Sequence, residues 1–171
     1  MSKDSKKQGA SPEKNTAGDQ SANNGNQQEV GPVFRLNGLF VKDISFENPR
    51  APEIFLQPPA QQPKMGVNID VGMKRIQNTT YEVVLRITTK AEEEGKTLFL
   101  VEIQHGGIFT INPNIPEEYH SRILFVDCAN VIFPFARRVI SDLTSEGGFP
   151  PLLLEPINFE AIYQQKLGRA A

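Results

Sequence analysis

The chain has 171 residues, a formal net charge of −2 and a single cysteine. This charge balance offers no bulk attraction for nucleic acid or an anionic membrane surface, and one cysteine cannot form an intramolecular disulfide. No run approaches the roughly 18 consecutive apolar residues that a membrane-spanning helix requires. We therefore expect a soluble protein without nucleic-acid binding or direct membrane insertion.

The first 31 residues differ in composition from the rest. They are rich in Ser, Asn, Gln, Lys and Gly, and all 11 Phe and all 3 Tyr residues follow them. Such a segment buries too little apolar surface to offset the entropy lost on ordering. We predict a disordered polar tail over 1–31, a folded domain over 32–168, and a C-terminal end at 169–171. The N-terminal lysines precede no apolar stretch, which favours a cytoplasmic location over secretion.

Alternation of apolar and polar side chains predicts four strands in the first part of the domain. The pattern covers roughly residues 34–47, 64–74, 81–88 and 97–105, and the short turns near Asn78 and Gly95 imply antiparallel neighbours. In the first strand, strict alternation places every second residue from Phe34 to Phe46 on one face. The residues between them lie on the other face, which ends in Asp43 and Glu47. We expect the pair Gly106-Gly107 to mark a bulge or bend.

The segment 48–63 contains five prolines, which predicts an extended loop without helix. Its apolar triplet Ile54-Phe55-Leu56 either docks on the core or binds a partner. From Asn130 the apolar spacing becomes helical and continues to Gly147-Gly148. A proline-rich connector carrying Leu152 to Leu154 then leads to a short helix from Asn158 through Leu167.

These elements predict an α+β fold, a four-stranded antiparallel sheet with two C-terminal helices packed on one face. The opposite face of the predicted sheet also carries apolar residues, among them Leu39, Val41 and Leu98. Large exposed apolar patches usually mark interfaces. We therefore expect a homo-oligomer, a bound partner, or both.

Motifs for catalysis and cofactor binding are missing from the sequence. Neither a phosphate-binding G-x-x-x-x-G-K-[ST] loop nor a dinucleotide-binding G-x-G-x-x-G motif occurs. His105, His120 and Cys128 lack the spacing of a zinc site, and a lone cysteine beside an apolar helix is typical of a buried thiol. The sequence predicts no enzyme, no cofactor, no metal site and no catalytic residue.

Four segments, spread over roughly residues 33–165, carry a family resemblance: Lys42-Asp43-Ile44-Ser45-Phe46-Glu47 with Pro49 and Ala51-Pro52; Tyr81-Glu82-Val83-Val84-Leu85-Arg86; Glu102 with Gly106-Gly107-Ile108-Phe109; and Phe133-Pro134-Phe135-Ala136-Arg137 continued by Gly148-Phe149-Pro150, Pro156 and Asn158-Phe159. Together, and in this order, they resemble the SecB family of protein-export chaperones.

The resemblance implies a homotetramer assembled as a dimer of dimers. It also implies an ATP-independent chaperone that binds unfolded precursor proteins, keeps them competent for translocation and delivers them to the SecA motor. The family's SecA-contacting positions match Asp43, Glu47, Leu100 and Glu102 here, on the outer face of the sheet.

Two sets of apolar residues are candidates for the remaining contacts. We expect unfolded clients to bind residues of the proline-rich loop, the connector and the last helix: Ile54, Phe55, Leu152, Leu154, Phe159, Ile162 and Tyr163. We expect the oligomer interface to use the apolar stripe of the main helix and the inner face of the fourth strand: Val101, Ile103, Val131, Ile132, Phe135, Val139 and Ile140.

Two alternatives stay open from the sequence. One is a SecB-like chaperone dedicated to a toxin–antitoxin pair, which differs from an export chaperone in its clients. The other is a carrier of a small apolar ligand, or an enzyme, built on the same sheet. A pocket with convergent polar groups would favour this second alternative.

Overall fold

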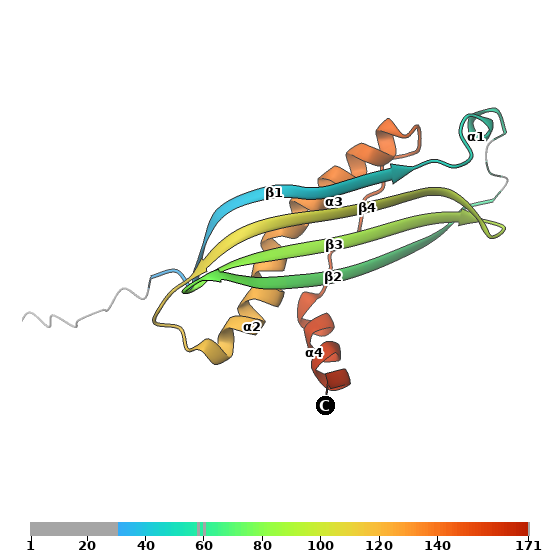
Figure 1. Ribbon diagram of the computed structural model, residues 1–171. Helices are drawn as coiled ribbons and strands as arrows, with labels where there is room; N and C mark the ends of the chain where they lie inside the picture. The colour runs from blue at the N-terminus through green and yellow to red at the C-terminus, as the bar shows by residue number, and fades with distance from the viewer. Residues whose placement is uncertain (1–30, 58, 60, 171) are drawn as a thin grey trace, which may run out of the picture. The chain divides into compact units, whose positions relative to one another are not determined.

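The structure is a computed structural model that describes residues 31–57, 59 and 61–170 (Figure 1). Four strands form one antiparallel sheet in the order β1-β4-β3-β2. Their bounds are β1 Phe34–Glu47, β2 Lys64–Gln77, β3 Thr80–Glu93 and β4 Lys96–Ile111. The predicted tail lies outside the described residues apart from Gly31.

The two predicted turns are confirmed as tight hairpins. Asn78 lies in the two-residue turn between β2 and β3, and Glu94 and Gly95 lie in the turn between β3 and β4. All three have a positive φ, of 43°, 49° and 77°. Glu94 and Gly95 are consecutive residues of positive φ, and such a pair forms the type of hairpin turn that matches the twist of the flanking strands.

The strict alternation predicted for β1 is wrong in its middle. The pairing of β1 with β4 shifts between Leu36 and Gly38 and again between Val41 and Asp43. Paired residues point to the same side of a sheet, so Phe40, paired with Gly106, lies on the face opposite to Phe46. The second shift restores the original phase, which an alternation rule cannot anticipate.

Of the bulge or bend predicted at Gly106-Gly107, the bulge is wrong, because no register shift occurs there. These glycines instead admit side chains of neighbouring residues. A Cβ at Gly106 would lie 2.6 Å from the Phe40 ring, and one at Gly107 would lie 2.5 Å from the Phe109 ring. The missing side chains therefore allow one aromatic ring to pack on each face of β4.

The helical part begins earlier than predicted. It starts with η1 (Glu117–Tyr119) and runs through α2 (His120–Arg122), η2 (Ile123–Cys128) and α3 (Ala129–Glu146). A proline is favoured in the first turn of a helix, which is consistent with the predicted start near Asn130, but Pro134 lies inside α3. The predicted end of the helix at Gly147-Gly148 is confirmed, because Gly148 has φ 82° and the Gly147 amide donates to the Leu143 carbonyl at 2.9 Å.

Two shorter helices complete the fold. Contrary to prediction, the proline-rich loop contains one helical turn, α1 (Glu53–Leu56), because its prolines lie before and after the turn rather than inside it. The last helix is α4 (Phe159–Ala170). The Asn158 side-chain oxygen accepts a hydrogen bond from the Ala161 amide at 2.9 Å, which confirms its predicted role as N-cap.

The core lies between the sheet and the helices. Helix α3 crosses one face of the sheet, and the opposite face carries no helix among the described residues (Figure 1). We call these the helix face and the outer face. Side chains that fill the space between β3, β4 and the helical segment are at most 3% exposed: Val83, Leu85, Ile87, Val101, Ile103, Phe109, Leu124, Phe125, Ile132 and Ile140.

Candidate functional site

A groove opens on one end of the molecule, where α1, the start of β2, the start of β4 and the segment after α3 meet. It encloses a cavity of about 820 Å³. Its lining is predominantly apolar and proline-rich: Ile54, Phe55, Pro59, Gln61, Gln62, Pro63, Met65, Leu98, Phe99, Gly148, Phe149, Pro150, Pro151 and Leu152. We call this cavity the groove.

Aromatic rings form one wall of the groove. The ring centroids of Phe99 and Phe149 lie 4.9 Å apart, and those of Phe55 and Phe149 lie 6.0 Å apart. Phe46 packs on the same cluster, 6.2 Å from Phe99. Phe55 remains 50% exposed. The wall therefore presents a large aromatic surface to which an apolar side chain can bind.

The apolar surface continues from the groove along the helix face of β2. Met65 lines the groove, Val67 is exposed two residues further on, and Ile69 lines a second cavity of about 240 Å³ between β2 and α4. Phe125 and Ile162 also line this second cavity. Because alternate residues of a strand share a face, these side chains form one path of apolar surface.

The structure brings together only some of the predicted client-binding residues. Ile54, Phe55 and Leu152 line the groove, and Ile162 lines the second cavity, next to Tyr163, whose ring lies 5.3 Å from that of Phe125. Ile54 is nevertheless a buried core residue at 3% exposure, and so are the remaining two predicted residues. Their side chains are 6% and 1% exposed: Leu154 and Phe159.

Several groove residues were missed by the sequence analysis. Phe99 and Leu98 are adjacent in β4 and both contribute to the groove, although alternation assigns them to opposite faces. The register shift between Ala91 and Glu92 of the paired strand accompanies this departure. Phe149 could have been found, because it directly follows the glycine pair that ends α3.

The four positions expected to contact SecA lie together on the outer face. Across the β1–β4 pair, Glu47 lies opposite Leu100, and Ser45 lies opposite Glu102. Asp43 lies opposite Gln104 on the same face. The three carboxylates are exposed and Leu100 is partly buried. We call this set the acidic face.

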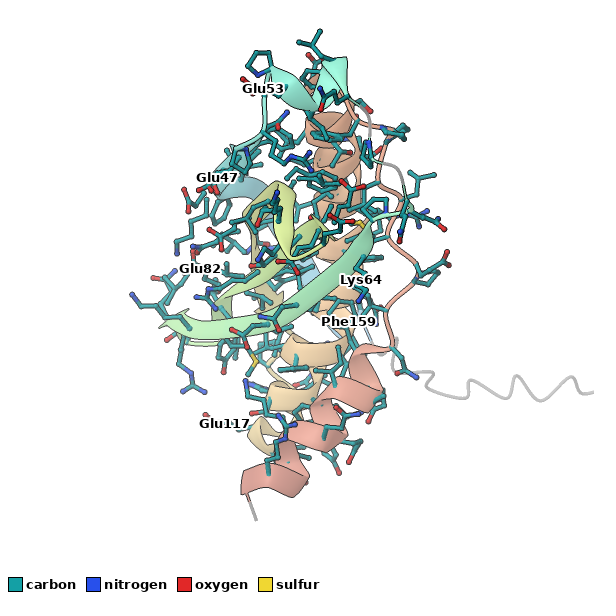
Figure 2. All side chains as sticks on the ribbon, turned by 90° about the vertical axis from the view of Figure 1, so that its right-hand side faces the viewer. Glu47, Glu53, Lys64, Glu82, Glu117 and Phe159 are labelled. Carbon is teal, nitrogen blue, oxygen red and sulfur yellow. The ribbon has the colours of Figure 1, made fainter. Side chains whose placement is uncertain are left out.

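The acidic face is not neutralised by neighbouring cations. In the described part of the chain, none of its three carboxylates forms an ion pair. Other carboxylates of the outer face do, since Glu82 accepts from Lys42 at 2.8 Å and Asp70 from Arg86 at 3.1 Å. Figure 2 shows Glu47 and Glu82 on the side of the sheet away from Phe159 and the helices. The groove and the acidic face thus occupy different surfaces.

Of the predicted oligomer-interface residues, four are already buried in the single chain. Val101, Ile103, Ile132 and Ile140 are at most 2% exposed, and they can affect a second copy only through their neighbours. The other three keep accessible surface. Val131 and Val139 are partly buried, and Phe135 is 44% exposed: these remain as candidates for direct contact.

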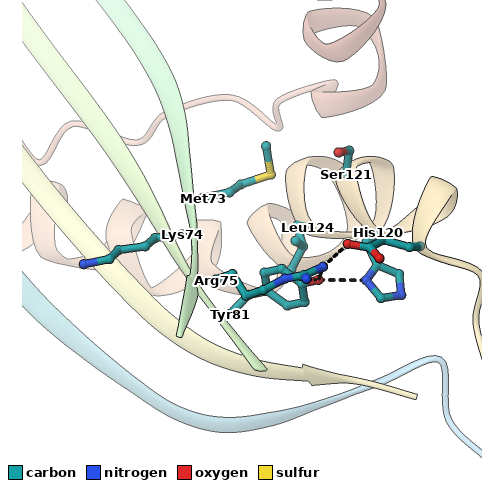
Figure 3. A pocket seen from close by; sticks show the side chains of 8 residues that line it. Met73, Lys74, Arg75, Tyr81, His120, Ser121 and Leu124 are labelled. Atoms are coloured by element: carbon teal, nitrogen blue, oxygen red, sulfur yellow. Dashed lines mark hydrogen bonds and ion pairs between the residues drawn. The ribbon is translucent and has the colours of Figure 1, made fainter. Parts of the chain in front are cut away.

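A polar network occupies a small cavity of about 180 Å³ at the other end of the sheet (Figure 3). His120 Nε2 lies 3.1 Å from the Ile115 carbonyl, so this nitrogen carries the proton and donates. Nδ1 then accepts from the Tyr81 hydroxyl at 2.9 Å, and Arg75 donates to the same hydroxyl oxygen at 2.7 Å. Arg75 also pairs with Glu117. The network joins β2 and β3 to the start of the helical segment, which is a structural role.

Other reactive groups are not arranged for chemistry. Cys128 is fully buried, and burial, with a smaller contribution from Asp127, raises the pKa of its thiol to about 12. The thiol therefore stays protonated at neutral pH. Among the residues with described positions, no group of three or more His, Cys, Asp or Glu side chains is placed to hold a metal ion, and no helix is long and apolar enough to cross a membrane.

The sheet with helices on one face, an apolar groove and a separate acidic surface define a binding protein. The family model "Preprotein translocase subunit SecB" matches residues 27–170. The protein-export protein SecB of Parvibaculum lavamentivorans is 44% identical over 147 residues, 86% of this chain and 86% of its own. That of Dechloromonas aromatica is 43% identical over 145 residues, 85% of this chain and 93% of its own.

The chain therefore belongs to the SecB family of protein-export chaperones. Membership supports a non-enzymatic, cytoplasmic chaperone of preproteins in Sec-dependent export, which interacts with precursor proteins and SecA. The structure also resembles the SecB-like chaperone of Mycobacterium tuberculosis solved with a ChAD peptide from the HigA1 antitoxin, with a TM-score of 0.62 over 73% of this chain and 91% of that chain. At 15% identity, this likeness supports the fold alone.

Proposed function

We propose that unfolded precursor proteins bind in the groove and along the apolar path on the helix face of β2, while SecA binds the acidic face. The observation that carries this proposal is the predominantly apolar cavity of about 820 Å³ on the helix side of the sheet. The carboxylates of the acidic face lie on the other side. A client and the motor can therefore bind at the same time.

An apolar groove suits clients that share no sequence. Removal of apolar surface from water contributes about 25 cal/mol per Å² without requiring a particular partner residue. Phe55 and Met65 are both partly exposed in the groove, and a methionine side chain adapts readily to partners of different shape. The same surface can accordingly accept many unfolded segments, and no nucleotide is needed for binding or release.

The acidic face suits a basic partner surface. Glu47 and Glu102 flank Leu100 on adjacent strands, and together they offer a small apolar contact with a charged rim. Unneutralised charges steer a partner of opposite charge and do so less effectively at high salt. This supports Asp43, Glu47, Leu100 and Glu102 as the SecA-binding residues.

We further propose that the chain assembles as a homotetramer, a dimer of dimers. An exposed apolar patch formed by Val41 and Ile44 of β1 and Phe135 of α3 supports this assembly, because monomers rarely leave such surface uncovered. We call it the β1–α3 patch. Light scattering at micromolar concentration is expected to show four times the chain mass of 19.0 kDa, and a persistent monomer would contradict the assembly.

A chaperone dedicated to a toxin–antitoxin pair is the second candidate. Its support is the likeness to the mycobacterial chaperone, which is a likeness of fold. The curated relatives at 40–44% identity are all protein-export proteins, which favours the export function.

Two substitutions, one in the groove and one in the second cavity, test the client site. Phe55→Asp and Ile162→Asp each place a carboxylate on the proposed apolar path, and we expect the affinity for an unfolded precursor to fall at least about tenfold, equivalent to ~1.4 kcal/mol. The control matched to Phe55→Asp is Ile76→Asp, because Ile76 is 52% exposed against 50% for Phe55 but lies outside both cavities. If all three variants bind like the wild type, clients bind elsewhere on the protein.

A further inference from the structure

His105 lies beneath the β1–α3 patch. It is paired with Val41 across the β1–β4 ladder, and its ring centroid lies 6.3 Å from that of Phe135. Its side chain is only 6% exposed, and its Nδ1 atom has no hydrogen-bond partner. A buried imidazole without a partner is more stable in its neutral form than in its charged form.

The surroundings of His105 also oppose its protonation. Burial lowers the pKa of His105; the backbone of Gly106 offsets part of this effect, and the guanidinium of Arg138 on α3 adds a smaller lowering. From β3, the residue paired with His105 is the apolar Leu85. No carboxylate of the described residues forms a hydrogen bond or ion pair with His105, so a positive charge on its ring would be stabilised only by the backbone of Gly106.

Carboxylates and cations on the neighbouring strands point away from His105. Asp43 of β1 and Arg86 of β3 both pair with Gln104 and therefore lie on the outer face. Glu102 lies on the outer face as well. The charged group that faces His105 from the elements packed against it is thus Arg138 of α3.

The charges on α3 favour a second copy of this chain as the occupant of the patch. Arg138 and Asp142 are both exposed and lie one helical turn apart. A two-fold axis that passes between them and relates antiparallel α3 helices would place each Arg138 beside the other copy's Asp142. An interface of this kind is complementary to itself and covers Phe135.

We propose that His105 acts as a protonation-sensitive element of this contact, so that copies associate through the β1–α3 patch when His105 is neutral and separate when it is charged. This inference rests on the proposed assembly. A covering copy removes the remaining water from the His105 ring, so the assembled state binds the proton less well than the separated chain. Assembly is therefore complete above the pKa of His105 in the separated chain, which burial lowers from its ordinary value, and weakens as the pH falls through this pKa.

Sedimentation of the full chain between pH 7.5 and pH 5.0 tests this inference. If separation of two copies is coupled to the uptake of one proton, the dissociation constant is expected to rise by up to about tenfold for each unit by which the pH falls below the pKa. His105→Gln keeps a polar side chain of similar size but cannot titrate, so its dissociation constant should stay nearly constant. His120→Gln removes the other histidine and should retain the pH dependence. Low net charge near the isoelectric point of about 5.7 affects association of the wild type and of both variants alike, so the comparison among them removes this effect.

Each outcome decides between the proposals. A wild-type assembly that does not change with pH, or a His105→Gln variant that keeps the change, overturns the inference and leaves the assembly intact. A wild type that is monomeric at pH 7.5 contradicts the assembly itself. If His105→Gln does not fold, NMR titration of the two wild-type histidines replaces it. The inference then requires a lower pKa for His105 in concentrated than in dilute protein, and equal values overturn it.

Discussion

The ring of Phe55 rests on Gly148, and an added Cβ at that position would lie 2.7 Å from the ring. Gly148 also has φ 82°, a conformation that residues with a side chain rarely adopt. This one residue therefore both ends α3 and leaves room for the exposed ring of the groove. The geometry of the groove depends on the same glycine as the end of the helix.

We expect Gly148→Ala to destabilise the fold and to weaken client binding. The positive φ costs ~1 kcal/mol for a residue with a side chain, and the displaced Phe55 ring adds to this loss. Thermal unfolding and client affinity are the measurements. Gly95→Ala is the matched control, because Gly95 has φ 77° but no atom within 4 Å of an added Cβ. Gly95→Ala should lose stability but keep its client affinity. Equal loss of client affinity in both variants would contradict the role of the Phe55 contact.

Thr144 connects the core to the groove. Its hydroxyl is buried, donates to a carbonyl of the preceding turn of α3 and accepts from the Leu152 amide at 2.9 Å. Thr144→Val leaves that amide without its partner, which is expected to cost about 1–3 kcal/mol of unfolding free energy. Urea unfolding measures this. Thr144→Ser keeps the hydroxyl and should lose less stability, so a serine variant as unstable as the valine variant would argue against the hydrogen bond.

Charge reversal separates the two proposed binding surfaces. Glu47→Lys and Glu102→Lys place cations on the acidic face, and together they should weaken SecA binding severely because a basic partner is then repelled. The holding of unfolded clients should stay nearly unchanged. Glu94→Lys changes the net charge in an exposed turn and serves as control. If client holding falls together with SecA binding, the two surfaces are not separate.

The Cys128 thiol is expected to resist modification in the native protein. Burial raises its pKa to about 12, so almost no thiolate exists at pH 8. Because the folded state holds this proton more tightly than the unfolded state, the contribution of Cys128 to stability is fully present below the unfolded pKa, about 8.5, and is lost as the pH rises toward 12. A thiol reagent should react slowly with the native chain and rapidly in urea. Equal rates would contradict the burial.

The sequence predicted the fold better than the site. The antiparallel strands, the end of α3 and the Asn158 cap follow from local signals, which one sequence contains. The two shifts in β1 do not, because they depend on pairing with β4. Leu154 and Phe159 illustrate the limit at the site, since they are as apolar as Phe55 but lie in the core. The residue type shows that a side chain is apolar, whereas the packing of the folded chain decides whether the core buries that side chain or leaves it for a client.

Site-specific photo-crosslinking tests the central claim most directly, because it reports which partner each surface touches. A photoreactive phenylalanine analogue is placed at Phe55 in the groove or at Glu47 on the acidic face, in chains mixed with an unfolded precursor and SecA. We predict crosslinks from position 55 to the precursor and from position 47 to SecA. Crosslinks from position 47 to the precursor, with none from position 55, would contradict the proposed division of the two surfaces.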